Sequence, residues 1–359
     1  MARTRPARSF FLSVALAAAA SAPLTAQADD SWELTYDIIN LLDAGADGGR
    51  FGFRVKQVNG PALMSHNTSG LFGRFYPAST IKVLHHLTAM RWVAQQGDIS
   101  ALYNTQIPVY QNSCSATGDI DFEPLDDVLQ AMMVNSNNQR TNAIQDFGPT
   151  NQAAINQTAQ GVVGMSWETQ LNHKFGCGGP ANNPANQMTI ADLTLLYERY
   201  LAGDLLDAGY MDEFEDLMLN EGNSTTWDGL VTWEASQLGL TQAQEDNFVA
   251  GFRYAHKGGN WGTTHVSRGG FVELPNRTCK GVVPLQYAYG VFVDEAVDTT
   301  AGLINSAARE MLRGEFRNAL RTFKPQALFS CIQDIKTLTP DAGGSVTLQP
   351  AVGTIVIDI

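Results

Sequence analysis

The sequence lacks several features that mark whole classes of protein. It holds six histidines and four cysteines in 359 residues, with no CxxC pair and no HExxH motif, although zinc ligands usually come in such close pairs. After residue 28 no segment is apolar enough to span a bilayer. The chain also contains no internal repeat and no low-complexity block. These absences argue against a zinc site, a membrane-embedded protein and a repeat array.

Basic residues are scarce as well. The chain has 23 Lys and Arg against 36 Asp and Glu, and only seven of the 23 are lysines. Residues 1–28 hold three of the arginines and no acid, so the remaining chain, with 20 basic and 36 acidic residues, has a formal charge of −16. Such acidity argues against nucleic acid or an anionic membrane as a partner.

Residues 1–28 have the pattern of an export signal. Three arginines precede the apolar run FFLSVALAAAA, and Ala26-Gln27-Ala28 supplies the small residues of a cleavage site. The apolar run is shorter than the ~20 residues that a spanning helix needs, and no cysteine stands near the cleavage point for lipid attachment. The sequence therefore predicts a mature chain that starts at Asp29, is periplasmic or secreted, and makes no membrane contact.

Export makes disulfides the expected state of the four cysteines, Cys114, Cys177, Cys279 and Cys331. Four cysteines allow three pairings, and the sequence leaves all three open. We favour Cys114 with Cys177 and Cys279 with Cys331 as a hypothesis.

Hydrophobic periodicity predicts the order helix, two strands, helices, three strands, helix. The strands are expected in RFGFRVKQV and ALMSHN near the start, and in FRYAHKGG, GGFVELP and LQYAYGVFVDEA after about residue 250. Helices are expected between Pro77 and about Ile144 and again from Thr189. The region from Gly148 to Met188 is rich in Asn, Gln and Gly, and predicts a long ordered loop.

This order fits an α/β (α+β) protein whose antiparallel five-stranded sheet is made from both ends of the chain and flanked by terminal helices. We assign residues 29–75 and 250–325 to a discontinuous α/β subdomain and residues 76–249 to an inserted all-helical subdomain. Residues 326–359 are a C-terminal extension without an assignment, although SVTLQP and GTIVIDI resemble strands.

The stretch YPASTIKVLHHL contains the only SxxK motif of the chain, Ser79 to Lys82. A serine at the start of a helix is commonly a cap. If Ser79 begins a helix, Lys82 lies on the same helix face as Ser79 and can reach its hydroxyl. The helix N-terminus also supplies N–H groups and partial positive charge that would stabilise an oxyanion. A serine is a poor nucleophile until a base takes its proton. The stretch is therefore compatible with a cap and with a nucleophile whose base is Lys82.

Three further polar stretches could complete such a site. SNN, from Ser136 to Asn138, follows an apolar helix and would otherwise be a capping loop. WETQLN holds Glu168, which would otherwise be one more solvated acid, and Asn172. HKGGN places Lys257 near a strand end, where a lysine before glycines is otherwise a surface residue at a turn.

Together and in this order, the four motifs resemble those of the class A serine β-lactamases and the wider group of penicillin-recognising serine hydrolases. STIK corresponds to SxxK, SNN to SDN, ETQLN to the ExxLN of the class A loop, and KGG to the KTG or KSG strand motif. The resemblance implies the β-lactamase/transpeptidase-like fold, with which the predicted element order agrees. It calls for no metal and no organic cofactor.

The resemblance also implies a role for each matching residue. Ser79 is the nucleophile, Lys82 holds or takes its proton, Ser136 relays a proton toward the leaving nitrogen, and Glu168 activates the water that hydrolyses the acyl-enzyme. The residues expected to bind the substrate or to position this water are Asn138, Asn172, Lys257, Gly259, Asn260 and Arg268. The backbone N–H groups of Ser79 and Asn260 are the expected oxyanion hole.

Two residues depart from the family pattern. Asn137 replaces the aspartate of SDN, whose typical role is to brace its loop. Gly258 replaces the Thr or Ser of the strand motif and so removes a hydroxyl that binds the substrate carboxylate. Such a hydrogen bond to a charged group is worth ~1.5–3 kcal/mol, or about ten- to a hundredfold in acylation. Candidates to replace it are Thr263, Thr264 and Arg268.

Outside the motifs, the stretch from Leu205 to Gly251 is longer than the family pattern and is interpreted as a solvated insertion, as is the tail after Phe329. We interpret His85 and His86, on the helix after Lys82, as packing residues. Strand alternation places His256 on the opposite face from Lys257.

Three functions remain open from the sequence. The leading hypothesis is a monomeric, exported hydrolase that opens β-lactams, which are small-molecule substrates, through an acyl-enzyme. The second is a hydrolase of another amide or ester, such as a peptidoglycan peptide, on the same scaffold. The third is a binding module that has kept the fold, against which the presence of Ser79, Lys82, Ser136 and Glu168 counts.

Overall fold

The computed structural model describes residues 30–69, 73–219, 225–324, 345–348 and 355–358. The predicted export signal, residues 1–28, lies outside these residues, as does Cys331. Within the C-terminal extension, β10 (Ser345–Leu348) pairs antiparallel with β11 (Ile355–Asp358), where the sequence indicated strands. Among the described helices, none is both long enough and apolar enough to cross a bilayer.

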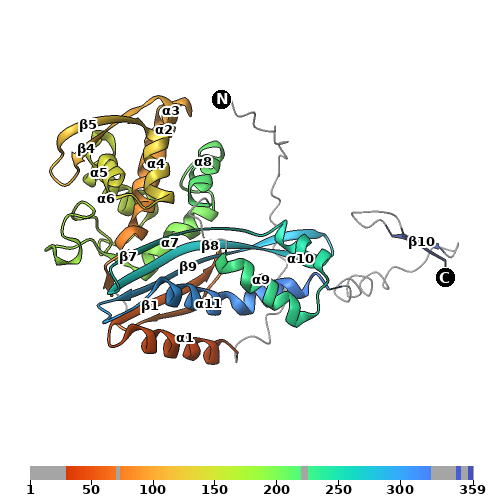
Figure 1. The fold of residues 1–359 in the computed structure, drawn as a ribbon. Helices are drawn as coiled ribbons and strands as arrows, with labels where there is room; N and C mark the ends of the chain where they lie inside the picture. The colour runs from red at the N-terminus through yellow and green to blue at the C-terminus, as the bar shows by residue number, and fades with distance from the viewer. Residues whose placement is uncertain (1–29, 70–72, 220–224, 325–344, 349–354, 359) are drawn as a thin grey trace.

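An antiparallel five-stranded sheet with the strand order β2-β1-β9-β8-β7 lies at the centre of the molecule (Figure 1). Its strands are β1 (Arg50–Gln57), β2 (Ala62–Asn67), β7 (Arg253–Trp261), β8 (His265–Thr278) and β9 (Gly281–Asp294). The N-terminal strand β1 pairs along its length with β9. Both ends of the chain therefore build one sheet, as the sequence predicted.

Helices cover one face of this sheet, which we call the outer face. They are α1 (Asp30–Ala46), α9 (Thr225–Leu238), α10 (Gln242–Val249) and α11 (Ala301–Arg321). The buried Trp227 of α9 stacks on Phe316 of α11 with ring centroids 5.4 Å apart. Residues 225–249, which the sequence analysis assigned to the helical subdomain, thus pack in the outer-face core. The stretch from Leu205 to Gly251, interpreted as a solvated insertion, therefore contributes buried apolar residues to this core.

The helical subdomain lies against the opposite, inner face (Figure 1). It begins with the 3-10 turn η1 (Ala78–Ile81), which continues into α2 (Lys82–Gln95). The other α-helices are α3 (Ser100–Asn104), α4 (Leu125–Val134), α5 (Asn138–Asp146), α6 (Gln152–Gln157), α7 (Ile190–Leu201) and α8 (Ala208–Leu219). Helix α2 is buried along most of its length, which explains why its hydrophobic pattern has little polar alternation.

Two parts of this subdomain differ from the sequence-based expectation. A hairpin of β4 (Gln106–Asn112) and β5 (Thr117–Pro124) stands where only helices were expected. The expected loop from 148 to 188 begins with helical segments: η2 (Gly148–Thr150), α6 and the π-helix η3 (Thr158–Val163). The buried apolar residues of α6 and η3 are Ile155, Ala159 and Val163, which form one stripe. A stripe of three apolar residues in an Asn- and Gln-rich stretch gives little periodic signal.

The same region also contains η4 (Gly179–Ala181) and two short strands, β3 (Arg74–Phe75) and β6 (Met188–Thr189), which pair antiparallel. This two-residue pairing joins the segment before Ser79 to the end of the loop that holds Glu168.

Helix α7 approaches the inner face of the sheet at two glycines. Gly269 of β8 and Gly290 of β9 face each other in the ladder. A Cβ atom at Gly269 would lie 2.5 Å from Leu193, and one at Gly290 would lie 2.9 Å from Ile190. The absence of side chains at these positions therefore permits the close packing of α7 on the sheet.

Candidate active site

Ser79 lies in η1, where the backbone of β7 comes very close to it. A Cβ atom at Gly259 would lie 2.5 Å from the Ser79 nitrogen and 2.7 Å from the Thr80 nitrogen. Two hydroxyls fix this contact, because Thr80 Oγ1 lies 2.7 Å from Ser267 Oγ, which also donates to the carbonyl of Pro77 at 2.8 Å. Strand β7 and the start of η1 thus meet backbone to backbone, and the N–H of Asn260 follows directly along the strand.

Lys82 connects the SxxK and SNN motifs. Its side chain is fully buried, and Nζ donates to the Ser136 carbonyl at 2.6 Å, to Ser136 Oγ at 3.3 Å and to Asn138 Oδ1 at 2.7 Å. The Phe175 ring lies 5.0 Å from the same ammonium. The hydroxyl of Ser79 makes no hydrogen bond with the residues that the structure describes. The lysine therefore joins the two motifs through Ser136 and Asn138.

Two residues of the site adopt left-handed backbone conformations that are uncommon for residues other than glycine. They are Ala78, with φ of 44°, which directly precedes Ser79, and Ser136, with φ of 53°. Such conformations cost free energy and persist only where the surrounding structure enforces them. The surrounding structure therefore fixes the backbone at Ser136 and directly before Ser79.

The substitution of Asn137 for aspartate has a direct structural explanation. Asn137 is the N-cap residue of α5, and its Oδ1 accepts a hydrogen bond from the Arg140 N–H at 3.0 Å. Asparagine caps helices about as well as aspartate does. The bracing role that the sequence analysis attributed to this position therefore needs no charge.

Lys257, Gly258 and Arg268 lie at the β7–β8 pair. Lys257 is fully buried and alternates with His256, which is also buried and stacks on Tyr254. Burial, together with the charges of Arg268 and Lys257, holds the pKa of His256 well below its usual value. The two residues thus face opposite sides of the strand, as expected.

Arg268 is directly opposite Gly258 in the ladder, so its side chain projects on the face where Gly258 has none. A Cβ atom at Gly258 would meet only the Ser267 carbonyl, at 3.8 Å. Thr264, in contrast, is engaged in the hairpin turn with the Trp261 carbonyl and His265. Of the three candidates to replace the missing hydroxyl, Arg268 is the one placed beside Gly258.

Glu168 and Asn172 are held in the loop between η3 and β6. The carboxylate of Glu168 is buried and pairs with the guanidinium of Arg74, which also lies 5.0 Å from the Trp167 ring. Asn172 donates from Nδ2 to the Ala185 carbonyl at 2.7 Å. Among the described residues, no contact joins Glu168 or Asn172 to Ser79 or Lys82. Arg74 has no counterpart in the four motifs and was not among the residues predicted for the site.

Buried polar residues fix this loop around Glu168. Asp192, in the first turn of α7, accepts from the Ser166 N–H at 2.9 Å, from Ser166 Oγ at 2.7 Å and from Thr169 Oγ1 at 2.6 Å. The side-chain amide of Asn142 bonds to both the N–H and the carbonyl of Phe175. The sequence assigned neither residue a role in the site, although Asn142 lies four residues after SNN on α5.

The Cys114–Cys177 disulfide joins the tip of the β4–β5 hairpin to the same loop, so this predicted pairing is confirmed. Lys174 strengthens the connection, because Nζ donates to the Ser113 carbonyl at 3.0 Å and pairs with Asp146. Cys279 is also disulfide-bonded, while Cys331 lies outside the described residues, so the second pairing stays a hypothesis.

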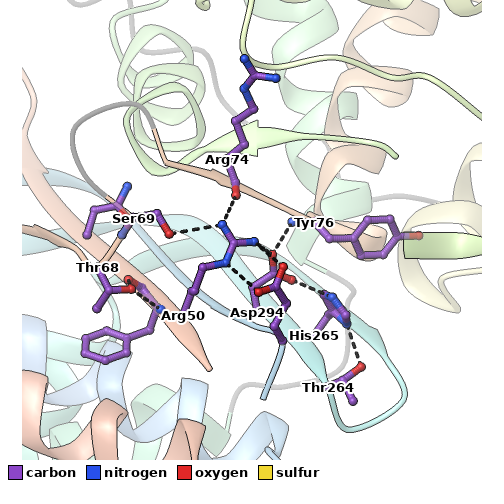
Figure 2. Close-up of polar contacts among 11 residues, drawn as sticks. Arg50, Thr68, Ser69, Arg74, Tyr76, Thr264, His265 and Asp294 are labelled. Atoms are coloured by element: carbon purple, nitrogen blue, oxygen red, sulfur yellow. Dashed lines mark hydrogen bonds and ion pairs between the residues drawn. The ribbon is translucent and has the colours of Figure 1, made fainter. Parts of the chain in front are cut away.

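A polar network supports the segment that enters the site (Figure 2). Asp294, buried at the end of β9, accepts from Arg50 Nη2 at 2.8 Å and from the Tyr76 N–H at 3.3 Å, and it pairs with His265 at 3.0 Å. Burial and the charge of Asp294 raise the pKa of Tyr76 to about 12. The network thus ties the sheet to Tyr76, two residues before Ala78.

Within the described residues, no three His, Cys, Asp or Glu side chains lie close enough together to hold a metal ion. The arrangement can support acyl transfer. It combines a serine at a helix start, a buried lysine bonded to a second serine, and a strand whose backbone borders the nucleophile.

A family model described as the beta-lactamase enzyme family matches residues 33–313. The chain belongs to this family. Membership supports a serine β-lactamase-like hydrolase that acts on cyclic amides. No curated protein matches the chain.

Solved structures of β-lactamases support the same fold. A β-lactamase from Sphaerobacter thermophilus is 21% identical, with a TM-score of 0.58 over 77% of this chain and 96% of its own. A β-lactamase from Chitinophaga pinensis is 15% identical, with a TM-score of 0.59 over 79% and 99%. PBP-A is 21% identical, with a TM-score of 0.57 over 79% and 96%. The chain thus has the β-lactamase/transpeptidase-like fold that the motifs implied.

Proposed function

We propose that the protein is an exported, monomeric class A-type hydrolase that opens β-lactam amides through an acyl-enzyme on Ser79. The observation that carries the proposal is the Lys82 ammonium, which bonds to Ser136 and Asn138 and thereby joins the two motifs that acylation requires. Such a buried, multiply bonded lysine next to two serines suits proton transfer between them.

Acylation follows from this arrangement. Lys82 first releases one proton to solvent, and the neutral amine then takes the hydroxyl proton of Ser79 as Oγ attacks the lactam carbonyl carbon. The N–H groups of Ser79 and Asn260 stabilise the negative charge on the carbonyl oxygen. When the carbon–nitrogen bond breaks, Lys82 returns the proton through Ser136 to the leaving nitrogen. Lys257 and Arg268 supply positive charge for the substrate carboxylate.

Deacylation requires a water molecule and a base. Glu168 takes a proton from the water, whose oxygen attacks the ester carbon, and Ser79 leaves with a proton returned through Lys82. Trp167 and Glu168 precede the loop asparagine Asn172 in the class A order. The proposal includes release of residues 1–28 on export, a region outside the described residues.

A chromogenic cephalosporin tests the proposal, with turnover followed by absorbance and the adduct followed by mass spectrometry. We expect steady hydrolysis by the wild type and a trapped adduct in Glu168→Ala, because loss of a general base slows its step by about 10²–10⁴-fold. Ser79→Ala is the matched control and should form no adduct. Absence of any adduct in the wild type at all concentrations would contradict the proposal.

A second candidate is a hydrolase of peptidoglycan peptides, which Gly258 favours because it removes a hydroxyl from the carboxylate site. PBP-A, one of the similar structures, has been solved in a mutant form as an acyl-enzyme complex with penicillin G. A wild-type adduct that persists for hours, with release of a terminal D-residue from a peptidoglycan pentapeptide, would favour this candidate.

A further inference from the structure

Arg74 occupies a position that none of the four motifs describes. It lies five residues before Ser79, in β3, and its side chain reaches the buried carboxylate of Glu168. We propose that Arg74 is a positioning residue for Glu168 and thereby controls the release of the acyl-enzyme. The inference rests on the proposed function, because it concerns the hydrolytic half of that reaction.

The backbone of Arg74 is fixed from two sides. Arg74 faces Thr189 in the β3–β6 pair, and its carbonyl accepts from Arg50 Nη1 at 3.3 Å. Figure 2 shows this carbonyl directed at Arg50 while the Arg74 side chain extends away from Arg50 and Asp294. The position of the Arg74 backbone is thus determined by the sheet and by β6.

Three groups of the loop surround the Arg74 side chain. Its Nε pairs with Glu168 Oε2, its Nη1 donates to Gln187 Oε1 at 3.1 Å, and the guanidinium carbon lies 5.0 Å from the Trp167 ring. A planar guanidinium can stack and donate in several directions at once, which an ammonium cannot. Arg74 therefore orients the Glu168 carboxylate through a fixed positive charge.

The contact leaves the second carboxylate oxygen available. Within the described part of the chain, neither carboxylate oxygen of Glu168 accepts a hydrogen bond, and Oε2 is held by its ion pair with Arg74. Asn172, which the class A pattern pairs with the same water, donates instead to the Ala185 carbonyl. A carboxylate held at one oxygen presents the other to water in a single orientation. Arg74 thus fixes the orientation of the base itself, a role separate from that expected of Asn172.

An ordinary surface ion pair contributes little to stability, but two observations distinguish the Arg74–Glu168 pair. The Glu168 side chain is only 8% exposed, whereas that of Arg74 is 42% exposed. The Arg74 side chain also makes no hydrogen bond or ion pair with Ser79, Lys82 or Ser136 among the described residues. Its removal should therefore affect deacylation and leave acylation intact.

The test separates these two steps with a chromogenic cephalosporin and a slowly released penicillin. Stopped-flow measurement and mass spectrometry give the rate of adduct formation on Ser79 and the rate of its loss. In Arg74→Ala we expect adduct loss to slow about ten- to a hundredfold, since misplacement of a catalytic group by about 1 Å costs that much, while adduct formation changes by less than about threefold.

Arg74→Lys should recover part of the loss, and added guanidinium ion should speed adduct loss in Arg74→Ala but not in the wild type. Arg313→Ala is the matched control, since Arg313 is similarly exposed, pairs with the buried Glu234 and lies over the Trp233 ring on the outer face of the sheet. In a Glu168→Gln background, removing Arg74 should have no further effect on adduct loss.

Unchanged adduct lifetime in Arg74→Ala would overturn the inference. An equal fall of both rates would overturn it as well, because that pattern indicates a structural defect. Failure of the wild type to form any adduct would instead refute the proposed function, so the two failures can be told apart.

Discussion

The two halves of the candidate site are held in place by different kinds of interaction. The acylation half consists of η1, α2, the SNN turn and β7, which meet through backbone contacts and one buried lysine. The deacylation half is the loop of residues 166–187 with Glu168, which is held by polar side chains and a disulfide. The first half depends on close packing, and the second on individual hydrogen bonds, which can be removed one at a time.

The sharpest way to break the acylation half is Gly259→Ala. Because a Cβ atom there would lie 2.5 Å from the Ser79 nitrogen, the strand or η1 must shift, and we expect acylation to fall about a hundredfold. Gly258→Ala is the matched control, since its Cβ meets only one atom, at 3.8 Å. Rates of adduct formation measure the effect, and equal rates in the two variants would show that the contact has no catalytic importance.

Removal of the Cys114–Cys177 disulfide tests the deacylation half. In the double variant Cys114→Ser/Cys177→Ser we expect the free energy of unfolding to fall by about 2–4 kcal/mol, measured by urea denaturation. Because the bond joins the β4–β5 hairpin to the loop and not to Ser79, adduct loss should slow more than adduct formation. A larger effect on formation would contradict the division into halves.

Gly258→Thr should improve the acylation half. The position has room for a side chain, and a hydroxyl beside the substrate carboxylate should raise acylation by about tenfold. Adduct loss should not change. Gly258→Val, which has a similar shape without the hydroxyl, is the control. An equal gain in both variants would attribute the effect to packing rather than to a hydrogen bond.

The acylation half should also make stability sensitive to acid. Burial lowers the pKa of His86, on α2, from 6.5 to about 3. The unfolded chain therefore binds one more proton than the folded chain between these values, and stability falls as the pH drops below about 6.5 by up to about 1.4 kcal/mol per pH unit. His86→Leu should reduce this slope by one proton in urea denaturation across that range. An unchanged slope would show that His86 is protonated in the folded state.

Sequence patterns predicted most of the fold. The sheet strands, α1, α2, α4, α7 and α11 were predicted because each has a clear period or clear flanking glycines and caps. The β4–β5 hairpin was missed because β5 is almost entirely exposed, so its alternation separates no buried face from a solvated one. The packing of α9 on the sheet was missed because the buried residues of this helix, such as Trp227, are interspersed with acidic and other polar residues.

For the site, the sequence identified residues with family counterparts and could not identify their supports. Lys82, Ser136 and Asn138 stand in recognisable motifs, and the structure brings them together. Arg74 pairs with Glu168, 94 residues later, and Asp192 bonds to Ser166, 26 residues earlier. No local sequence pattern marks contacts between residues so far apart in the chain. The Arg268 position opposite Gly258 likewise depends on the register of two strands.

The glycine pair under α7 has a consequence for how the enzyme can change. Leu193 rests on Gly269 and Gly290, and Asp192, its neighbour in the same helix turn, bonds to the residues on both sides of Glu168. The size of the residues at positions 269 and 290 therefore sets the distance of α7 from the sheet. Because α7 bonds to the loop through Asp192, the same residues also set the position of the loop. Substitutions inside the sheet can thus retune the lifetime of the acyl-enzyme, so new substrate preferences can arise from positions that no substrate touches.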